Sequence, residues 1–222
     1  MRVGALVEVG LLETMRVREG RLPWLGRHLA RLRASVAALG VAEPPGDVAD
    51  LARIAAGAGD RVVRVELRDG HVELATRDVN AERAVTVVVS DEPHRPYPHK
   101  TTQRDQFGRA LAGARRTGAH DALLVTPDGY VAEGTSWNLF WWDAGTLYTP
   151  AQGLGVLPGI GRSRVMELTG VTEVRVPVSA LAGRSLFLVN AVRGIVEIAS
   201  LQGEPVPSDP RTAELSSSFW PD

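Results

Sequence analysis

The sequence predicts a mixed α/β (α+β) protein, and three local patterns carry this prediction. Apolar residues recur every three to four positions after Gly26, the period of an amphipathic helix, at Leu29, Leu32, Val36 and Leu39. Segments 61–67 and 71–74 are rich in β-branched and apolar residues, and the Asp69-Gly70 pair between them suits a hairpin turn with positive φ. Segment 91–99 holds three prolines in nine residues, which is typical of a linker.

The first part of the chain is expected to alternate between strand and helix. A strand region over 3–18 ends at the turn Glu19-Gly20, and the helix that begins at Gly26 ends at Gly40, a typical C-cap residue. A second helix follows the Pro44-Pro45-Gly46 break, runs over 48–55 and ends at Gly57 or Gly59. The hairpin and a third strand over 84–89 complete this part.

The second part is expected to be richer in strands. Helices are predicted over 104–117 and from about 162 to 168. Strands are predicted over 122–125, 130–134, 137–142 and 146–148, and near 174, 186–190 and 195–198, with a hairpin turn at Asp128-Gly129. The acidic tail after Gln202 contains proline and serine, and we expect it to be a surface extension.

The composition is that of an ordinary soluble globular protein, with 44% hydrophobic residues, 23% charged residues and a net charge of -1. This balance gives no electrostatic reason to expect nucleic acid or anionic membrane as a partner. The absence of cysteine excludes disulfides, thiolate metal ligands and a cysteine nucleophile. No apolar run approaches the roughly 18 residues of a membrane span, so we expect a cytoplasmic protein.

Lys100 is the only lysine in 222 residues, and it follows the proline-rich segment in the order Pro98-His99-Lys100-Thr101-Thr102. A lysine amine can lose its proton and attack a carbonyl, whereas an arginine guanidinium stays charged. A single amine kept in an arginine-rich chain therefore indicates nucleophilic chemistry. The alternative is a surface lysine without a chemical role.

Other types of catalytic site find little support in the sequence. The five histidines show no paired metal-ligand spacing, so we predict no metal site. The Gly-x-Ser-x-Gly pattern of serine hydrolases is missing, and Gly153-Leu154-Gly155 lacks the third glycine of a dinucleotide-binding motif.

Three further features fit a phosphate-bearing cofactor. The glycine-rich segment 155–163 opens a predicted helix, whose first backbone N–H groups suit a phosphate, and Arg31 can add a forked contact. Glu133 is flanked by apolar residues and can keep a ring N–H cation protonated. Each feature also has an ordinary explanation, namely a plain loop, a solvated arginine and a strand-end surface glutamate. Together with Lys100, they match the requirements of pyridoxal 5'-phosphate.

The chain also resembles the class IV (fold type IV) pyridoxal-phosphate enzymes, which include branched-chain and D-amino acid aminotransferases and 4-amino-4-deoxychorismate lyase. The resemblance extends over nearly the whole length, and its order and spacing are specific. The segments that carry it are Leu12 to Val17, Arg27 to Leu32, His99 to Thr102, Val131 to Phe140, Gly155 to Ile160 and Asn190 to Gly194.

The resemblance implies a D-amino acid aminotransferase-like fold and a homodimer with the cofactor in the cleft between two domains. We expect a small N-terminal α/β domain over 1–95, a linker over 96–99 and a larger C-terminal domain over 100–222. Lys100 is then the Schiff-base lysine, Arg31 binds the phosphate, Glu133 pairs with the pyridine nitrogen, and Ile160 and Gly161 hold phosphate through the backbone. We also assign cofactor binding to Ser136 and Asn138, and substrate binding to Ala191, Val192, Arg193 and Arg104.

Within the family, the segments Leu11 to Val17, His99 to Thr102 and Asn190 to Gly194 look most like the aminodeoxychorismate lyases, which release pyruvate and form 4-aminobenzoate. The fork of Arg193 suits a substrate carboxylate, and the alternative is that Arg193 is a structural loop arginine. The alternative activity is transamination of a D-amino or branched-chain amino acid with a 2-oxo acid. A third alternative is a non-catalytic relative that binds the cofactor or a partner.

Overall fold

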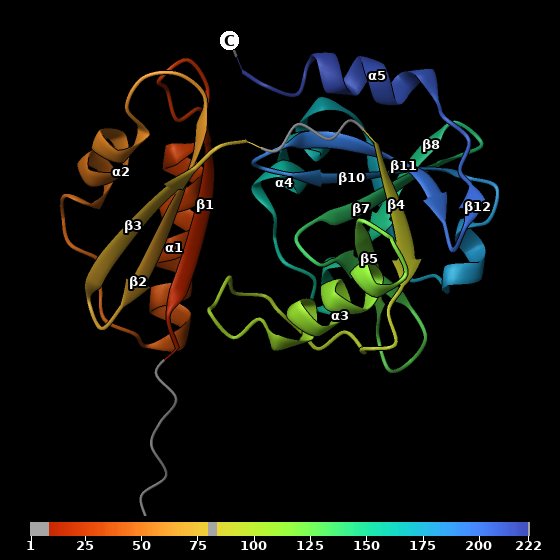
Figure 1. Cartoon of the computed structure of the whole chain (residues 1–222), viewed down its shortest axis with the longest axis horizontal. Coiled ribbons are helices and arrows are strands. Elements are labelled where there is room, and N and C mark those ends of the chain that lie inside the picture. Colours follow the sequence, from red (N-terminus) through yellow and green to blue (C-terminus); the bar gives the residue numbers. More distant parts are fainter. Residues whose placement is uncertain (1–8, 80–83, 222) are drawn as a thin grey trace, which may run out of the picture. The chain divides into compact units, whose positions relative to one another are not determined.

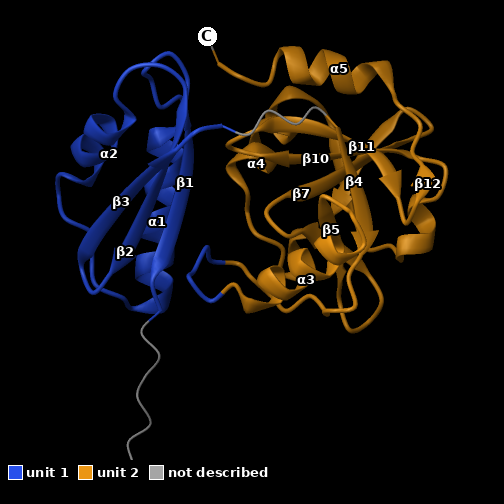
Figure 2. Cartoon of the chain, viewed as in Figure 1, with its two compact units in different colours: residues 1–79, 99–103 blue, residues 80–98, 104–222 orange. Residues whose placement is uncertain are grey.

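The computed structural model describes residues 9–79 and 84–221, and its internal contacts divide the chain into two compact units. Unit 1 contains the N-terminal residues up to Val79 together with His99–Gln103, and unit 2 contains Asn80–Pro98 and Arg104–Asp222 (Figure 2). Helices and strands occur in both units, which confirms the predicted mixed α/β class.

This division differs from the predicted domain boundaries in two places, and strand pairing explains both. Strand β4 (Ala84–Val89) lies in unit 2 because it pairs in parallel with β11 (Gly194–Leu201) and β5 (Asp121–Val125). Lys100 lies in unit 1 because its carbonyl accepts a hydrogen bond from the Leu12 N–H at 2.8 Å. The chain thus returns to the first unit for a short segment that begins at the end of the predicted linker.

Unit 1 is a three-stranded antiparallel sheet with helices packed on one face (Figure 1). The sheet has the order β1-β2-β3, with strands β1 (Leu11–Val17), β2 (Arg61–Arg68) and β3 (His71–Arg77). Helices α1 (Leu25–Leu39) and α2 (Val48–Ala56) bury their apolar stripes against it. Burying an aliphatic side chain contributes about 1.5–3 kcal/mol, so this shared core holds the unit together.

The structure confirms both helices of this unit and the hairpin, because each was set by local sequence. Gly40 ends α1 in the left-handed conformation with φ of 65°. Asp69 and Gly70 have φ of 50° and 75°, as the tight turn between β2 and β3 requires. The predicted first strand is confirmed over β1, whereas residues 3–8 of that prediction lie outside the described residues.

Unit 2 is built on strands that close into a ring (Figure 1). Strand β10 (Ser185–Asn190) pairs with β11 on one side and with β7 (Asn138–Asp143) on the other. The ring is completed through β4, β5 and β6 (Val131–Gly134), and it surrounds a core that includes Trp137 and Trp141. The remaining described strands are β8 (Thr146–Pro150), β9 (Val171–Val174) and β12 (Glu204–Pro205).

The helices of unit 2 are α3 (Asp105–Arg116), α4 (Ile160–Leu168) and α5 (Pro210–Ser217), with short 3-10 turns at Gln152–Leu154 and Val178–Leu181. The expectation of a surface tail after Gln202 is wrong. Helix α5 begins at an Asp209 cap that accepts the Arg211 N–H at 3.0 Å, and Phe219 after it is fully buried. A few buried apolar side chains hold this segment in place. Because most of its residues are polar, the sequence did not indicate a packed helix.

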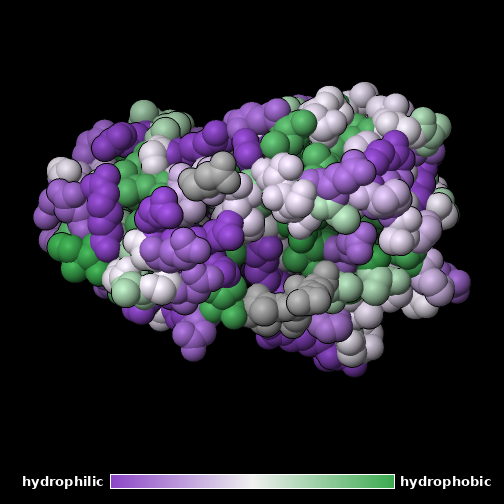
Figure 3. All heavy atoms as spheres, turned by 90° about the horizontal axis from the view of Figure 1, so that it is seen from above, coloured by the Kyte–Doolittle hydropathy of each residue, from purple (hydrophilic) through white to green (hydrophobic). Residues whose placement is uncertain are grey.

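The face shown in Figure 3 mixes hydrophilic and hydrophobic residues over both units. Several arginines on the surface are paired with acids, as at Arg109 and Glu92, whose closest nitrogen and oxygen lie 2.7 Å apart. This interleaving matches the net charge of -1. In the described part of the chain, no helix has both the length and the apolar character needed to cross a membrane.

Candidate active site

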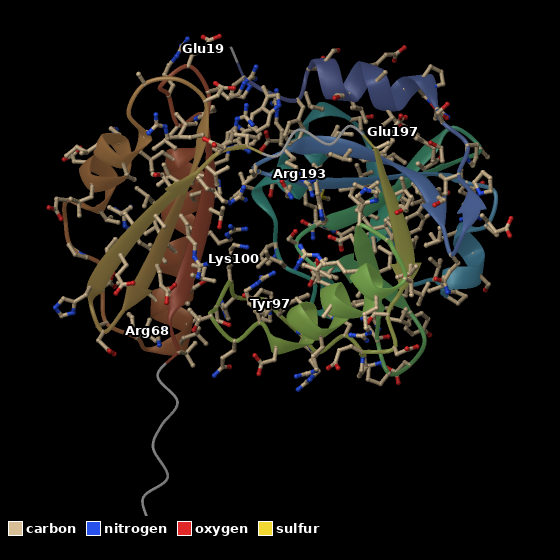
Figure 4. All side chains as sticks on the ribbon, viewed as in Figure 1. Glu19, Arg68, Tyr97, Lys100, Arg193 and Glu197 are labelled. Carbon is tan, nitrogen blue, oxygen red and sulfur yellow. The ribbon has the colours of Figure 1, made fainter. Side chains whose placement is uncertain are left out.

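Lys100 lies in unit 1, in the segment that runs beside β1 (Figure 4). Beyond its own contact with Leu12, the backbone that follows it stays paired with the start of β1: Thr101 forms a bridge with Leu11, and the Thr102 N–H donates to the Gly10 carbonyl at 2.8 Å. The lysine side chain is therefore carried on backbone that is fixed to a strand, which limits its freedom of position.

Arg31 belongs to a buried charged cluster with Glu13 and His28. Its Nε and Nη2 donate to the two carboxylate oxygens of Glu13 at 2.8 and 2.6 Å, and His28 Nδ1 lies 2.6 Å from Oε2. Glu13 is 1% exposed, and burial alone would raise the pKa of its carboxyl. The charges of Arg31 and His28 and their hydrogen bonds prevail and lower this pKa to about 2.

The charge of Lys100 also acts on His28. Burial lowers the pKa of the His28 imidazole, the Glu13 carboxylate opposes this change, and the charges of Arg31 and Lys100 add to the lowering. The Arg31 guanidinium and the Lys100 amine are thus the two cationic groups whose charges act on His28, opposite the buried Glu13 carboxylate. Glu13 fixes the direction of the guanidinium.

Glu133 lies in unit 2, within β6, and is 3% exposed, so it is not the surface residue that sequence alone left open. Its Oε1 lies 3.0 Å from His94 Nε2. The Leu157 N–H donates to both carboxylate oxygens, at 3.3 and 3.2 Å. These donors stabilise the ionised carboxylate that a protonated ring nitrogen requires.

The turn that follows Glu133 is fixed by a buried aspartate, Asp121. One Asp121 oxygen accepts the N–H groups of Ala122 and Thr135 at 2.8 and 2.9 Å. The other accepts Thr135 Oγ1 at 3.0 Å and Trp137 Nε1 at 3.1 Å. Burial raises the pKa of the Asp121 carboxyl, and these four donors oppose that effect. Ser136, at the tip of the turn, is exposed.

Asn138 holds the start of α4. Its Nδ2 donates to the Leu157 carbonyl at 3.0 Å, and its Oδ1 lies where a side chain on Gly159 would be. A Cβ on Gly161 would lie 2.8 Å from the carbonyl carbon of Asn190. Glycine is thus required where α4 meets its neighbours, and backbone N–H groups at the helix start suit an anion.

The predicted substrate loop follows β10 and is also held by Asn190. Asn190 Oδ1 accepts the N–H groups of Val192 and Arg193 at 2.9 and 2.8 Å, and Asn190 Nδ2 donates to the Ser136 carbonyl at 3.3 Å. The Arg193 guanidinium, labelled in Figure 4, lies over the Trp137 ring at 4.2 Å from its centroid. Ala191 and Val192 are buried, each 9% exposed.

Arg104 supports the same turn. It donates to the Thr135 carbonyl at 2.7 Å and to the Tyr97 hydroxyl at 3.3 Å, and it lies 4.8 Å from the Phe107 ring centroid. These contacts are within unit 2. Substrate binding by Arg104 stays a prediction.

In unit 2 the structure brings most of the predicted residues together at one end of β6, β7 and β10. Val189 pairs with Asn138, which places the turns after β6 and β10 side by side, and Gly161 of α4 abuts Asn190. Lys100 and Arg31 lie in unit 1.

Sequence reasoning missed four residues that hold these side chains, namely Glu13, His94, Asp121 and Asn190. Glu13 could have been found, because alternate residues of a strand share a face and Glu13 alternates with the buried Leu11 and Met15. That spacing indicates a carboxylate on the buried face of the strand.

Each unit contains groups of the kinds that pyridoxal phosphate requires. Unit 1 contains the Lys100 amine and the Arg31 guanidinium, and unit 2 contains the buried Glu133 carboxylate and the start of α4, where side chains at Gly159 and Gly161 would meet neighbouring atoms. In residues 9–79 and 84–221, no group of three or more histidine and acidic side chains could hold a metal ion.

The chain is similar in sequence and in fold to known proteins. Branched-chain-amino-acid aminotransferase from Escherichia coli K12 is 34% identical over 79 residues, which cover 36% of this chain and 26% of that protein. The branched-chain aminotransferase structure from Thermoproteus uzoniensis has a TM-score of 0.88 at 20% identity, covering 95% of this chain and 84% of the other. A Legionella pneumophila structure, provisionally assigned as 4-amino-4-deoxychorismate lyase, has a TM-score of 0.78 at 23% identity, covering 95% and 91%.

The match to the E. coli relative spans about a quarter of that protein's length, and the two structures share the fold with this chain. The sequence profile of the class IV amino-transferase family matches residues 10–201. This confirms the predicted fold type and, because the family depends on pyridoxal phosphate, the predicted cofactor. The chain belongs to the class IV aminotransferase family of pyridoxal-phosphate-dependent enzymes.

Proposed function

We propose that this protein is a 4-amino-4-deoxychorismate lyase, which eliminates pyruvate from its substrate and forms 4-aminobenzoate. The observation that carries the proposal is Arg193 in the loop after β10. Its backbone is fixed by Asn190 and its guanidinium lies over the Trp137 ring. A guanidinium held in this way offers its fork to a carboxylate at little entropic cost, and the substrate bears carboxylates.

The residues predicted to bind the cofactor each have a separate role. Arg31 and the backbone N–H groups of Ile160 and Gly161 bind phosphate, and Glu133 keeps the ring nitrogen protonated. Bound pyridoxal phosphate supplies the electron sink for a substrate that has lost a proton.

Lys100 moves the protons in this scheme. Its amine would hold the cofactor and, once released from it, would take a proton from the substrate ring. The bond between the ring carbon and the enolpyruvyl oxygen would then break, enolpyruvate would leave, and the substrate ring would become aromatic. The proton held on Lys100 would pass to the methylene carbon of enolpyruvate and convert it into pyruvate. The same lysine serves a transaminase equally well, so the lysine alone does not select the reaction.

A product assay tests the proposal. The purified protein, loaded with cofactor, is incubated with aminodeoxychorismate, and 4-aminobenzoate and pyruvate are measured together. We expect equal amounts of the two products from the unaltered protein and neither from Lys100→Ala. Absence of both products from the unaltered, cofactor-bearing protein would reject the lyase activity.

A second candidate, transamination, is favoured by the names of the curated relatives, which are branched-chain aminotransferases. The discriminating measurement is the visible spectrum on addition of an amino acid alone. Loss of the cofactor band with formation of the pyridoxamine form indicates a transaminase. A stable yellow protein that passes neither assay indicates a non-catalytic member of the family.

Arg193→Met tests the assignment of substrate binding. If Arg193 binds a substrate carboxylate, kcat/KM of the lyase reaction falls about 10- to 100-fold, while the free energy of unfolding stays the same. This is the loss expected for a hydrogen bond to a charged group. A structural loop arginine would give the opposite pattern, with lower stability and unchanged kcat/KM.

We also propose that the protein forms a homodimer. Light scattering during gel filtration tests this by measuring the molar mass in solution.

A further inference from the structure

His94 and Glu133 form a buried pair in unit 2. The His94 side chain is fully buried, the Glu133 side chain is 4% exposed, and His94 Nε2 lies 3.0 Å from Glu133 Oε1. The Leu157 N–H contacts are longer, at 3.2 and 3.3 Å, so His94 is the closer of these donors. A buried imidazole therefore contributes to fixing the position of this carboxylate oxygen, together with the Leu157 N–H.

The backbone around His94 is held from two elements. The His94 N–H donates to the Val125 carbonyl at the end of β5, at 2.7 Å. The backbone of the next residue, Arg95, is held by Gln106 of α3. Gln106 Oε1 accepts the Arg95 N–H at 2.6 Å, and Gln106 Nε2 donates to the Arg95 carbonyl at 2.9 Å. The ring thus has little freedom to leave Glu133.

The hydrogen of the His94 ring is assigned to Nε2, because the carboxylate facing it can only accept. Among the described residues, the other ring nitrogen, Nδ1, has no hydrogen-bond partner although it is buried. Burying an unsatisfied nitrogen costs free energy, so packing alone gives no reason for a histidine here. The contact with Glu133 is the polar interaction that the side chain gains.

We propose that His94 is a positioning residue that acts through Glu133, an inference that rests on the proposed role of Glu133 toward the cofactor ring nitrogen. Donation from Nε2–H stabilises the carboxylate as an anion and fixes its orientation. An anion held in this way leaves the shared proton on the ring nitrogen. Without the donor, the carboxylate is more basic and takes a larger share of that proton.

The experiment uses apoprotein titrated with pyridoxal phosphate, together with the ¹⁵N chemical shift of ring-labelled cofactor. His94→Leu removes the donor, whereas His94→Gln can retain one near the position of Nε2. We expect His94→Leu to weaken cofactor binding about tenfold and to move the shift toward the unprotonated value, and His94→Gln to restore both in large part. His120→Leu is the matched control, because His120 is an exposed histidine of the same unit.

A double-mutant cycle separates this role from general packing. If His94 acts through Glu133, His94→Leu adds no further loss of affinity in the Glu133→Gln protein. Additive losses, or an unchanged shift in His94→Leu, would overturn the inference. If His94→Leu does not fold, an unchanged shift in His94→Ala or His94→Asn apoprotein that does fold would overturn it equally. Failure of the unaltered protein to bind any cofactor would instead reject the proposed function.

Discussion

Replacing Glu13 with glutamine tests the buried cluster of unit 1. The folded protein lowers the pKa of Glu13 from 4.5 to about 2. This difference corresponds to about 3 kcal/mol of folding free energy at pH 7, similar to the cost of breaking a buried ion pair. Glu13→Gln removes the charge that faces Arg31, so we expect the free energy of unfolding to fall by about 3 kcal/mol.

The stabilisation that Glu13 contributes should depend on pH. Because the folded-state pKa lies below the ordinary value, the stabilisation is complete above pH 4.5 and is lost as the pH falls toward 2. The difference between the unaltered protein and Glu13→Gln should therefore shrink to about 1.5 kcal/mol at about pH 3.

The assay is a urea titration followed by pulsed hydrogen exchange, read on peptides from β1 and β2 so that it reports unit 1. Glu66→Gln is the matched control. Glu66 lies in the same sheet and also bonds two arginines, Arg64 and Arg68, but on the surface, so its loss should cost below about 1 kcal/mol. A difference for Glu13→Gln that is independent of pH, or no larger than that for Glu66→Gln, would refute the reasoning.

Two other substitutions, Gly161→Ala with Gly108→Ala as its control and Asp121→Asn, test the framework of unit 2. Gly161→Ala places a methyl group 2.8 Å from the Asn190 carbonyl carbon and should cost about 1–3 kcal/mol and weaken cofactor binding. At Gly108 an added Cβ meets no atom within 4 Å, so Gly108→Ala should stabilise α3 by about 0.5–1 kcal/mol. If Gly161→Ala and Gly108→Ala changed the melting temperature equally, the steric explanation would be contradicted. Asp121→Asn places an amide donor opposite the donors of Thr135 and Trp137, and it should lower the free energy of unfolding by about 2–4 kcal/mol. An unchanged Trp emission spectrum and an unchanged melting temperature would argue against this role of Asp121.

Local chemistry was sufficient for many elements. The spacing of Leu29, Leu32 and Val36 with a terminal Gly40 predicted α1, and Asp69-Gly70 predicted the hairpin, because helix period and turn conformation depend on neighbours in sequence. The order of the family motifs predicted the fold type and the cofactor. Lys100, as the only lysine of the chain, indicated which amine is available for nucleophilic chemistry.

Partners far apart in sequence could not be predicted in the same way. Strand β4 has the sequence of any strand, and only its pairing with β5 and β11 places it in unit 2. The helix after Asp209 was missed because its polar residues outnumber the side chains that anchor it.

The sequence by itself determined the fold class, the family and the identity of the candidate reactive amine. Only the tertiary structure decided that Glu13 orients Arg31, that His94 contacts Glu133 and that Asn190 joins the loop of Arg193 to Ser136. The physical reason is that a hydrogen bond depends on position within a few tenths of an ångström, and that position is set by packing between segments up to dozens of residues apart.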